Sequence, residues 1–249
     1  PYIETRTVQR RPMGTAPLTA EEKRLLQQSL PAGFAVHWFE TPGERWQVAR
    51  LLYGNAFTRL IMKEGYDVHS KIIDWGKKFS IDKIPEQALG VDPATAKLMK
   101  WALASWQRFE FMAKYLGGTI APRLQLDLVP ALKCSAHFVL YSTGEVPATL
   151  EQQLEAGRAL QRFWLTAAKL KLGFQPEQTP VIFSTYLRDK LTFTTNQQAY
   201  DNAVAMDKKL VALLPAQVYA NKVFFGRLGR GEQPASRSLR FSLDQLITN

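Results

Sequence analysis

The sequence predicts an α+β fold in which helices flank a central, mostly antiparallel sheet. Two observations lead to this prediction. Long helical patterns dominate and four or five strand patterns are scattered among them, whereas a parallel sheet would require regular alternation of strands and helices. In addition, residues 149–183 have the pattern of one long buried helix, a glycine stop and a returning strand, around which the other elements can pack.

The long helix has clear end signals. Thr149 and Gln152 form a capping-box pattern at its start. Gly173 follows its last turn, where glycine readily takes the left-handed conformation. Apolar residues between these ends cover more than half of the helix circumference. We therefore expect this helix to pack on several sides, and to be followed by a strand near 181–187.

The elements before this helix follow similar signals. Thr19 opens a short helix through a second capping box, and a strand of β-branched and aromatic residues follows at 35–39. Thr41 is the expected N-cap of the next helix. Residues 66–78 are expected to be helical, and Asp92 opens a long helix rich in aromatic residues that runs to the Gly-Gly pair after Leu116.

Buried strands and a basic tail complete the chain. The near-continuous apolar run at 137–142 is typical of a central strand. A helix at about 197–214 and a strand near 223–227 follow the long helix. Because no repeat or linker composition interrupts the pattern, we expect a single domain over 1–249, with an irregular arm at 1–17 and a basic tail at 228–249.

The charge excess is spread in a way that disfavours nucleic acid. Lys and Arg number 32 against 22 Asp and Glu, so that 32 − 22 gives +10. The arginines gather at the two ends of the chain, and neither a long basic run nor a basic-aromatic sheet motif is present. We therefore expect no nucleic-acid partner, and an anionic small ligand becomes the simplest explanation of the arginines.

Composition also limits the location of the protein. The single cysteine, Cys134, forms no intrachain disulfide, and its neighbours in sequence suggest a small apolar residue entering a strand, with no base nearby. No apolar run approaches the roughly 20 residues needed to span a bilayer. We therefore expect a cytoplasmic protein without membrane contact. The opening PYIETRTVQRRP lacks an initiator Met, which suggests a domain of a longer protein.

Familiar catalytic motifs are missing. The sequence contains no GxSxG, no Walker loop, no GxGxxG before a helix and no histidine pair at zinc spacing. His37, His69 and His137 lie far apart, so we expect no metal site. No set of side chains can carry redox chemistry alone, whereas a bound organic cofactor would supply it.

Four segments resemble the FMN-dependent nitroreductase family: TRTVQRRP, EAGRALQRFWLTAAKLKLGFQPEQTP, HFVLYS and GRLGRGEQPASRSLRFSLDQL. Further segments are most similar to the nitroreductase-like domain that follows a ThiF-type adenylating domain in some bacterial proteins: RLIMKEGYDVHSKIIDWGKKFS, QALGVDP, MKWALASWQRFEF and APRLQLDLVPAL. The resemblance covers nearly the whole chain.

This resemblance implies an intertwined homodimer with two FMN molecules at the subunit interface, in which the long helix is the dimer-core helix and the basic tail reaches the cofactor or the partner subunit. It assigns nine residues to FMN: Arg6, Thr7, Gln9, Arg237, Ser238 and Arg240 at the phosphate, and Gly173, Phe174 and Gln175 beside the flavin ring.

The implied activity is transfer of hydride from NADH or NADPH through FMN to an electron-poor small molecule, in a ping-pong cycle. No side chain need act as an acid or base. The acidic residue that often follows the Leu-Gly turn corresponds to Glu177 in one alignment, and an equally good alignment places Ile182 there.

An alternative hypothesis follows from two departures. LPAGFAVHWFE at 30–40 stands where the family has Pro-Ser-x-x-Asn-x-Gln-Pro-Trp, which reads the polar edge of the flavin, and Gln9 stands in place of a cation. The chain can therefore also be a catalytically altered scaffold that serves an adenylating domain, in the same or a partner chain, as a dimerisation or nucleotide-recognition module.

Overall fold

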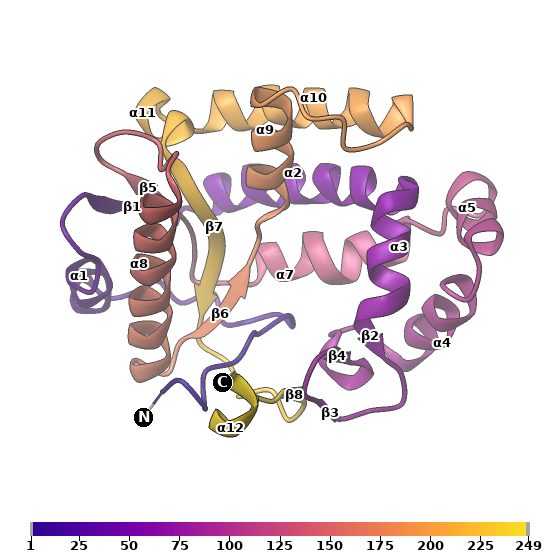
Figure 1. Cartoon of the computed structure of the whole chain (residues 1–249), viewed down its shortest axis with the longest axis horizontal. Coiled ribbons are helices and arrows are strands. Elements are labelled where there is room, and N and C mark those ends of the chain that lie inside the picture. The colour runs from indigo at the N-terminus through magenta and orange to yellow at the C-terminus, as the bar shows by residue number, and fades with distance from the viewer. Residues whose placement is uncertain (1, 248–249) are drawn as a thin grey trace.

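A four-stranded antiparallel sheet lies at the centre of the protein (Figure 1). The computed structural model describes residues 2–247. The strand order is β1 (Phe34–Phe39), β5 (Ala136–Ser142), β7 (Lys222–Gly229) and β6 (Gly173–Pro176), and every neighbouring pair is antiparallel. Together with the flanking helices, this sheet confirms the predicted α+β class.

The remaining elements follow in chain order: α1 (Ala20–Gln28), α2 (Pro42–Ile61), α3 (Lys63–Ile72), β2 (Ile73–Asp74), β3 (Phe79–Ser80), β4 (Ile84–Pro85), the 3-10 helix η1 (Glu86–Ala88), α4 (Pro93–Ala102), α5 (Trp106–Tyr115), α6 (Ile120–Pro122), the π-helix η2 (Arg123–Leu128), α7 (Val129–Leu132), α8 (Leu150–Lys169), α9 (Thr179–Arg188), α10 (Gln197–Leu213), α11 (Ala216–Ala220), β8 (Arg237–Ser238) and α12 (Leu243–Leu246).

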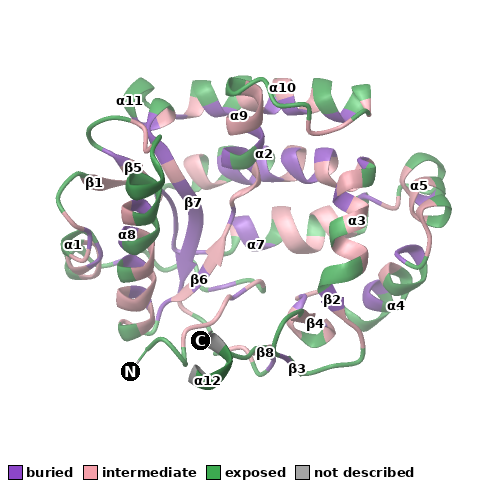
Figure 2. Ribbon diagram, viewed as in Figure 1, coloured by how far each residue is buried: buried purple, intermediate pink, exposed green. Residues whose placement is uncertain are grey.

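Each face of the sheet has its own core, because successive side chains of a strand point to opposite faces. Phe138 and Phe224 pack under α8 and α1. Phe39, Val139 and Phe225 face α2, α7 and α10. Figure 1 shows α8 on one side of β7, and α2 and α7 on the other. In Figure 2, β7 is drawn almost wholly as buried, which agrees with its central place in the sheet.

The long helix α8 is present with its predicted capping box, but it is not packed on several sides within one chain. Ala156, Ala159, Phe163 and Ala167 form one buried stripe against the sheet, and the opposite face of the helix is exposed. The helix therefore flanks the sheet. Its apolar residues are more numerous than this single stripe needs.

Four other expectations were wrong in detail. The apolar run near 181–187 is the buried helix α9, which starts with Pro180 in its first turn. The long aromatic helix after Asp92 is interrupted, because Ser105 caps a new helix, α5, by accepting a hydrogen bond from the Arg108 N–H. The left-handed residue after α8 is Lys171, with φ 57°, and not Gly173. Residues 66–78 are helical as far as Ile72.

The arm extends the sheet beyond β6. Val8 forms a parallel bridge with Phe174, and the Gln9 N–H donates to the Phe174 carbonyl at 2.8 Å. Gly173 permits this close approach, because an added Cβ would lie 2.7 Å from Met13 Sδ. The arm therefore lies along the edge of β6, where the end of α8 also arrives.

Phe163 tests the core between α8 and the sheet. Its ring is fully buried, 4.8 Å from the Phe138 ring centroid. Because truncation leaves a cavity, we expect Phe163→Ala to lower the free energy of unfolding by about 3–5 kcal/mol in urea titrations. Phe111→Ala is the control, since Phe111 is 50% exposed, and it should change the stability little. Equal losses in both variants would contradict this packing.

Candidate functional site

A groove lies between the arm, the end of α8 and the tail. We call it the terminal groove. Its volume is about 340 Å³, at the lower end of the range of small-molecule sites. It is lined by Tyr2, Thr5, Arg6, Thr7, Gln9, Trp164, Ala168, Leu172, Gly173, Gly231, Glu232, Gln233, Pro234 and Arg237. Segments from both ends of the chain and from its middle therefore meet at one site.

Arg6 is the cation best placed to hold a ligand in this groove. Its guanidinium lies 4.2 Å from the Trp164 ring centroid, and Trp164 stacks on Phe174 at 4.3 Å. Arg6 Nε is buried and has no hydrogen-bond partner among the described residues. Burial and the nearby Arg240 lower the pKa of Arg6. An anion beside Arg6 would relieve both penalties.

The tail arginines fasten the arm. Arg237 Nη1 donates to the Glu4 carbonyl at 2.7 Å. Arg240 donates to the Arg6 carbonyl at 3.1 Å and to the Ile3 carbonyl at 3.3 Å. These contacts fix the backbone on either side of the Arg6 side chain, so the tail positions the arm as well as adding positive charge.

The structure brings together part of the set predicted from sequence. Five of the nine residues line the terminal groove: Arg6, Thr7, Gln9, Gly173 and Arg237. Phe174 is buried in the core beneath Trp164. Ser238 donates to the Lys83 carbonyl, and Arg240 holds the arm backbone. Gln175 faces a different cavity, described below.

A buried cluster of charges lies behind β6. The Glu177 carboxylate accepts from His137 Nδ1 at 2.6 Å and from Arg227 Nη1 at 2.7 Å. Arg227 Nη2 also donates to the Arg10 carbonyl at 3.0 Å, which ties the cluster to the arm. The His137, Glu177 and Arg227 side chains are at most 4% exposed. The Glu177 carboxylate is therefore shared by two buried cations, His137 and Arg227.

His137 is protonated. Nδ1 faces the Glu177 carboxylate and Nε2 faces the Ala131 carbonyl at 2.9 Å, so both ring nitrogens donate. Burial lowers the pKa of His137, but the Glu177 carboxylate and the neighbouring Cys134 together outweigh it and raise the pKa to about 10. Burial likewise raises the pKa of Glu177, and His137 and Arg227 reverse this effect so that the net change is downward. The cluster is therefore ionised at neutral pH.

The strand register explains why the cluster forms. His137 pairs with Arg227 across β5 and β7, and Arg227 pairs with Gln175 across β7 and β6. His137, Arg227 and Gln175 therefore lie in one row across the sheet. The sequence places His137 in an apolar strand and Arg227 near the basic end of the chain, and local patterns do not predict that the two meet. The available signal was a charged residue inside each of two apolar strands, since such residues need buried partners.

The expectation that no base lies near Cys134 was wrong. Its neighbours in sequence suggested that no base lies nearby, but His137 Nε2 is 3.5 Å from Cys134 Sγ. The thiol is fully buried and donates to the Ala131 carbonyl at 3.2 Å. Because His137 is already protonated, it does not serve as a base for this thiol.

Two cavities adjoin Gln175. The charged cavity, of about 120 Å³, is lined by Arg10, Arg59, Asp127, Gln175, Glu177 and Arg227, among others. The apolar chamber, of about 420 Å³, lies among α3, α4, α5 and η2. Both are lined by Arg10, Arg59 and Gln175. Of the two alignments for the acidic position, Glu177 lies at these cavities, whereas Ile182 is on α9 and 40% exposed.

Over residues 2–247, His, Cys, Asp and Glu nowhere gather in a group of three or more that could hold a metal ion. Within the same part of the chain, the helices are all too short or too polar to cross a membrane.

Comparison with known proteins identifies the fold. No protein-family model and no curated protein matches the chain. The FMN-dependent nitroreductase NfnB from Mycobacterium smegmatis, solved with NADPH, matches with a TM-score of 0.52 and 11% identity, over 99% of this chain and 95% of that chain. The chain has the nitroreductase fold. An FMN-bound nitroreductase from Bacteroides fragilis aligns over 98% of this chain and 94% of its own, with a TM-score of 0.47 and 11% identity.

The charged cluster predicts a pH dependence of stability. Folded His137 keeps its proton up to about pH 10, whereas the unfolded residue releases it near 6.5. The folded chain therefore binds more protons in this window, and this contribution to stability falls as the pH rises. Urea titrations over this range should show a smaller fall in the free energy of unfolding for His137→Gln than for the wild type.

Comparing the variant with the wild type separates the contribution of His137 to the pH dependence from that of other titratable groups. Lys222, whose pKa burial lowers to about 8, contributes a slope of the opposite sign in both proteins. His37→Gln is the matched control, because burial lowers the pKa of His37 and places its titration below this window. A wild-type slope retained in His137→Gln would contradict the assignment.

Proposed function

We propose that the protein is an FMN-dependent oxidoreductase that binds the cofactor along the arm and β6. The observation that carries the proposal is the terminal groove of this nitroreductase fold. Arg6 lines it between the two ends of the chain, and the buried Nε of this arginine has no hydrogen-bond partner among the described residues. NfnB, which shares the fold, is FMN-dependent and was solved with NADPH.

The residues present fit such a cofactor. Arg6 and Arg237 supply two cations for a phosphate, and arginine binds phosphate through paired N–H donors. Gly173 and Gln175 are two positions apart on β6, about 7 Å along a strand, and lie on the same face of it. An elongated ligand can therefore extend from the terminal groove at Gly173 towards the two cavities at Gln175.

When bound, FMN would supply hydride transfer from NADH or NADPH to an electron-poor acceptor in a ping-pong cycle. The chain would contribute binding and orientation. Glu177 stays out of proton transfer in this proposal, because its carboxylate is held by His137 and Arg227. We therefore assign Glu177 to holding β5, β6 and β7 together, and no side chain to acid or base catalysis.

We further propose that two copies form the working unit. Segment 30–40 stands where the family has the flavin-edge motif. It includes β1, which lies at the opposite edge of the sheet from β6. Within one copy it is therefore separated from the groove by β5 and β7, and a second copy would be needed to bring it there. The outward face of α8, with Leu150 and Leu154 exposed, is the surface we assign to this contact.

A second candidate function is a scaffold for an adenylating domain, in the same or a partner chain. The observation that favours it is the use of tail donors. Arg237 and Arg240 already donate to arm carbonyls, so fewer donors remain for a phosphate than the resemblance implies.

A spectrum and a turnover assay separate the two functions. The protein should be reconstituted with FMN, desalted and examined for flavin absorbance, then assayed for NADH and NADPH oxidation with a quinone or a nitroaromatic acceptor. Retained flavin with turnover supports the oxidoreductase. Flavin without turnover favours the scaffold, and failure to retain flavin refutes the first proposal.

Arg6→Ala should weaken FMN retention. Loss of a charge-assisted hydrogen bond and of the stack on Trp164 should raise the dissociation constant roughly ten- to a hundredfold, measured by quenching of flavin fluorescence. Arg108→Ala, at an exposed position of α5, removes the same charge away from the groove and should leave the constant unchanged. Equal constants in wild type and Arg6→Ala would place the phosphate elsewhere.

Leu154→Glu should dissociate the proposed pair. Leu154 is 54% exposed in one chain, and a charge placed at a buried contact is costly. Light scattering after size exclusion should show a dimer for the wild type and a monomer for the variant. Val68→Glu, at a position 57% exposed on α3, should remain dimeric. A monomeric wild type would refute the assignment.

A further inference from the structure

The apolar chamber has walls suited to the body of a small organic molecule. Ile72 from α3, Leu98 and Met99 from α4, and Phe109 and Met112 from α5 line it. Its volume of about 420 Å³ lies within the range of small-molecule sites. Figure 1 shows these helices standing apart from the sheet, and the chamber lining also includes Gln175 of β6. An uncharged surface of this extent favours an apolar ligand body.

The end of the chamber nearest the sheet is polar and incompletely satisfied. Arg59 Nε and Gln175 Oε1 are both buried and lack hydrogen-bond partners among the described residues. Arg227, 2% exposed in the adjoining charged cavity, also has a buried Nε without a partner in that part of the chain. Buried polar groups are normally paired, so these atoms indicate a missing ligand group.

Charges at this end do not balance. Four cations, Arg10, Arg59, His137 and Arg227, face two carboxylates, Glu177 and Asp127, so that 4 − 2 leaves +2. Glu177 is shared by His137 and Arg227, and Asp127 lies 3.4 Å from Arg59.

Arg10 has the weakest compensation of the four. Its Nη1 donates to the Ala88 carbonyl at 3.2 Å, and no carboxylate pairs with it among the described residues. Burial and the charge of Arg227 lower its pKa. Arg10 is half-buried, and a cation that is partly removed from water is stabilised by an anion.

We propose that the apolar chamber binds a compact organic anion, with its apolar body among α3, α4 and α5 and its carboxylate against Arg10 and Arg59. If the proposed oxidoreductase function holds, this anion is the electron acceptor. The acceptor role rests on that function, whereas binding of the anion does not. The binding site itself rests on the chamber and on its two cations, of which Arg59 is paired with Asp127 and Arg10 has no carboxylate partner among the described residues.

The position of the chamber fits this role. It shares Gln175 with the charged cavity, and Gln175 lies on the same face of β6 as Gly173 in the terminal groove. A molecule in the chamber therefore lies next to the end of a ligand that extends along β6. The two compartments carry separate cations, Arg6 and Arg237 in one and Arg10 and Arg59 in the other.

A ligand series tests the proposal on the unaltered protein. The probes are 4-nitrobenzoate, 4-nitrobenzyl alcohol and 4-nitrobenzylamine, which share one body and differ in charge. Calorimetry on FMN-free protein should give a dissociation constant roughly ten- to a hundredfold lower for the acid than for the alcohol, as expected for a charged hydrogen bond. The amine should bind most weakly. Equal constants for the three, or no binding, would overturn the proposal.

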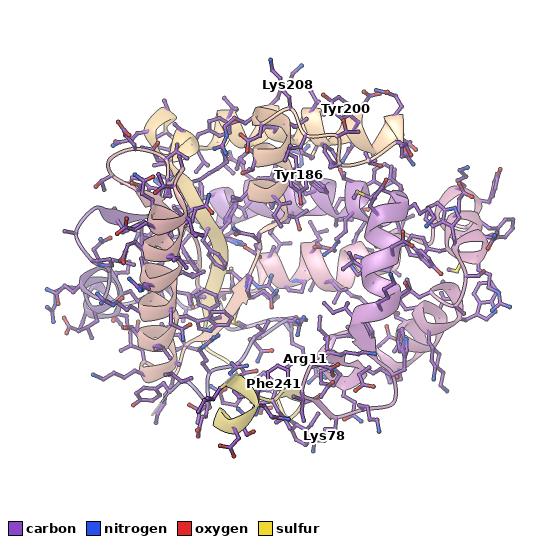
Figure 3. The ribbon with its side chains drawn as sticks, viewed as in Figure 1. Arg11, Lys78, Tyr186, Tyr200, Lys208 and Phe241 are labelled. Atoms are coloured by element: carbon purple, nitrogen blue, oxygen red, sulfur yellow. The ribbon has the colours of Figure 1, made fainter. Side chains whose placement is uncertain are left out.

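Variants locate the site. Arg10→Gln should reduce the preference for the acid over the alcohol at least severalfold. Arg11→Gln is the matched control. Arg11, which follows Arg10 and is labelled in Figure 3, is exposed and does not line the chamber, so this variant should keep the preference. Ala113→Trp places an indole in the chamber and should weaken acid and alcohol alike. Unchanged binding in both Arg10→Gln and Ala113→Trp would place the probe elsewhere.

An assay on FMN-loaded protein distinguishes the two proposals. If FMN is retained, 4-nitrobenzoate should be reduced with a lower KM than the alcohol, and Arg10→Gln should raise that KM more than it changes kcat. If FMN is not retained, the oxidoreductase proposal fails and the calorimetric result still decides the chamber. Loss of 4-nitrobenzoate binding on addition of FMN would show that the two share one site and would overturn the inference.

Discussion

The arrangement of the sheet and the arm depends on one buried carboxylate. Glu177 accepts hydrogen bonds from His137 on β5 and Arg227 on β7, and Arg227 in turn donates to the Arg10 carbonyl of the arm. Four segments remote in sequence, β5, the end of β6, β7 and the arm, are thereby joined at a buried site. Breaking such a cluster leaves buried charge without a partner, which costs about 3–5 kcal/mol. A shift of the strand register would separate these partners and incur this cost.

This constraint also shapes the cavities. Because Glu177 is already shared by two cations, it has little capacity left to compensate Arg10 and Arg59, and the positive charge that remains faces the apolar chamber. The terminal groove repeats the pattern on a smaller scale, with Arg6 held between Trp164 and the arm carbonyls that the tail arginines fix. Both compartments adjoin the same short strand, β6, and both present cations to a cavity. An anionic cofactor and an anionic acceptor are the ligands that such a pair of sites fits.

Much of the fold could be predicted from local patterns, and the failures have physical causes. The capping boxes at Thr19, Thr41 and Thr149 and the N-cap at Asp92 all form, because they depend on residues within one helical turn. The strand expected near 181–187 is the helix α9, because a short apolar run is compatible with either structure and its period does not distinguish them. The break between α4 and α5 was missed because the aromatic pattern continues across Ser105, which instead caps the second helix.

The sequence by itself determined the α+β class, most helix starts, the two central strands and the gathering of arginines at both ends, since these follow from propensity, capping and composition. The family resemblance also assigned Arg6, Thr7, Gln9, Gly173 and Arg237 to one site. Only the tertiary structure decided that these five line one groove while Phe174 lies in the core, and that His137, Glu177 and Arg227 form one ionised cluster. Strand register and desolvation decide these points, and both depend on residues that are far apart in the chain.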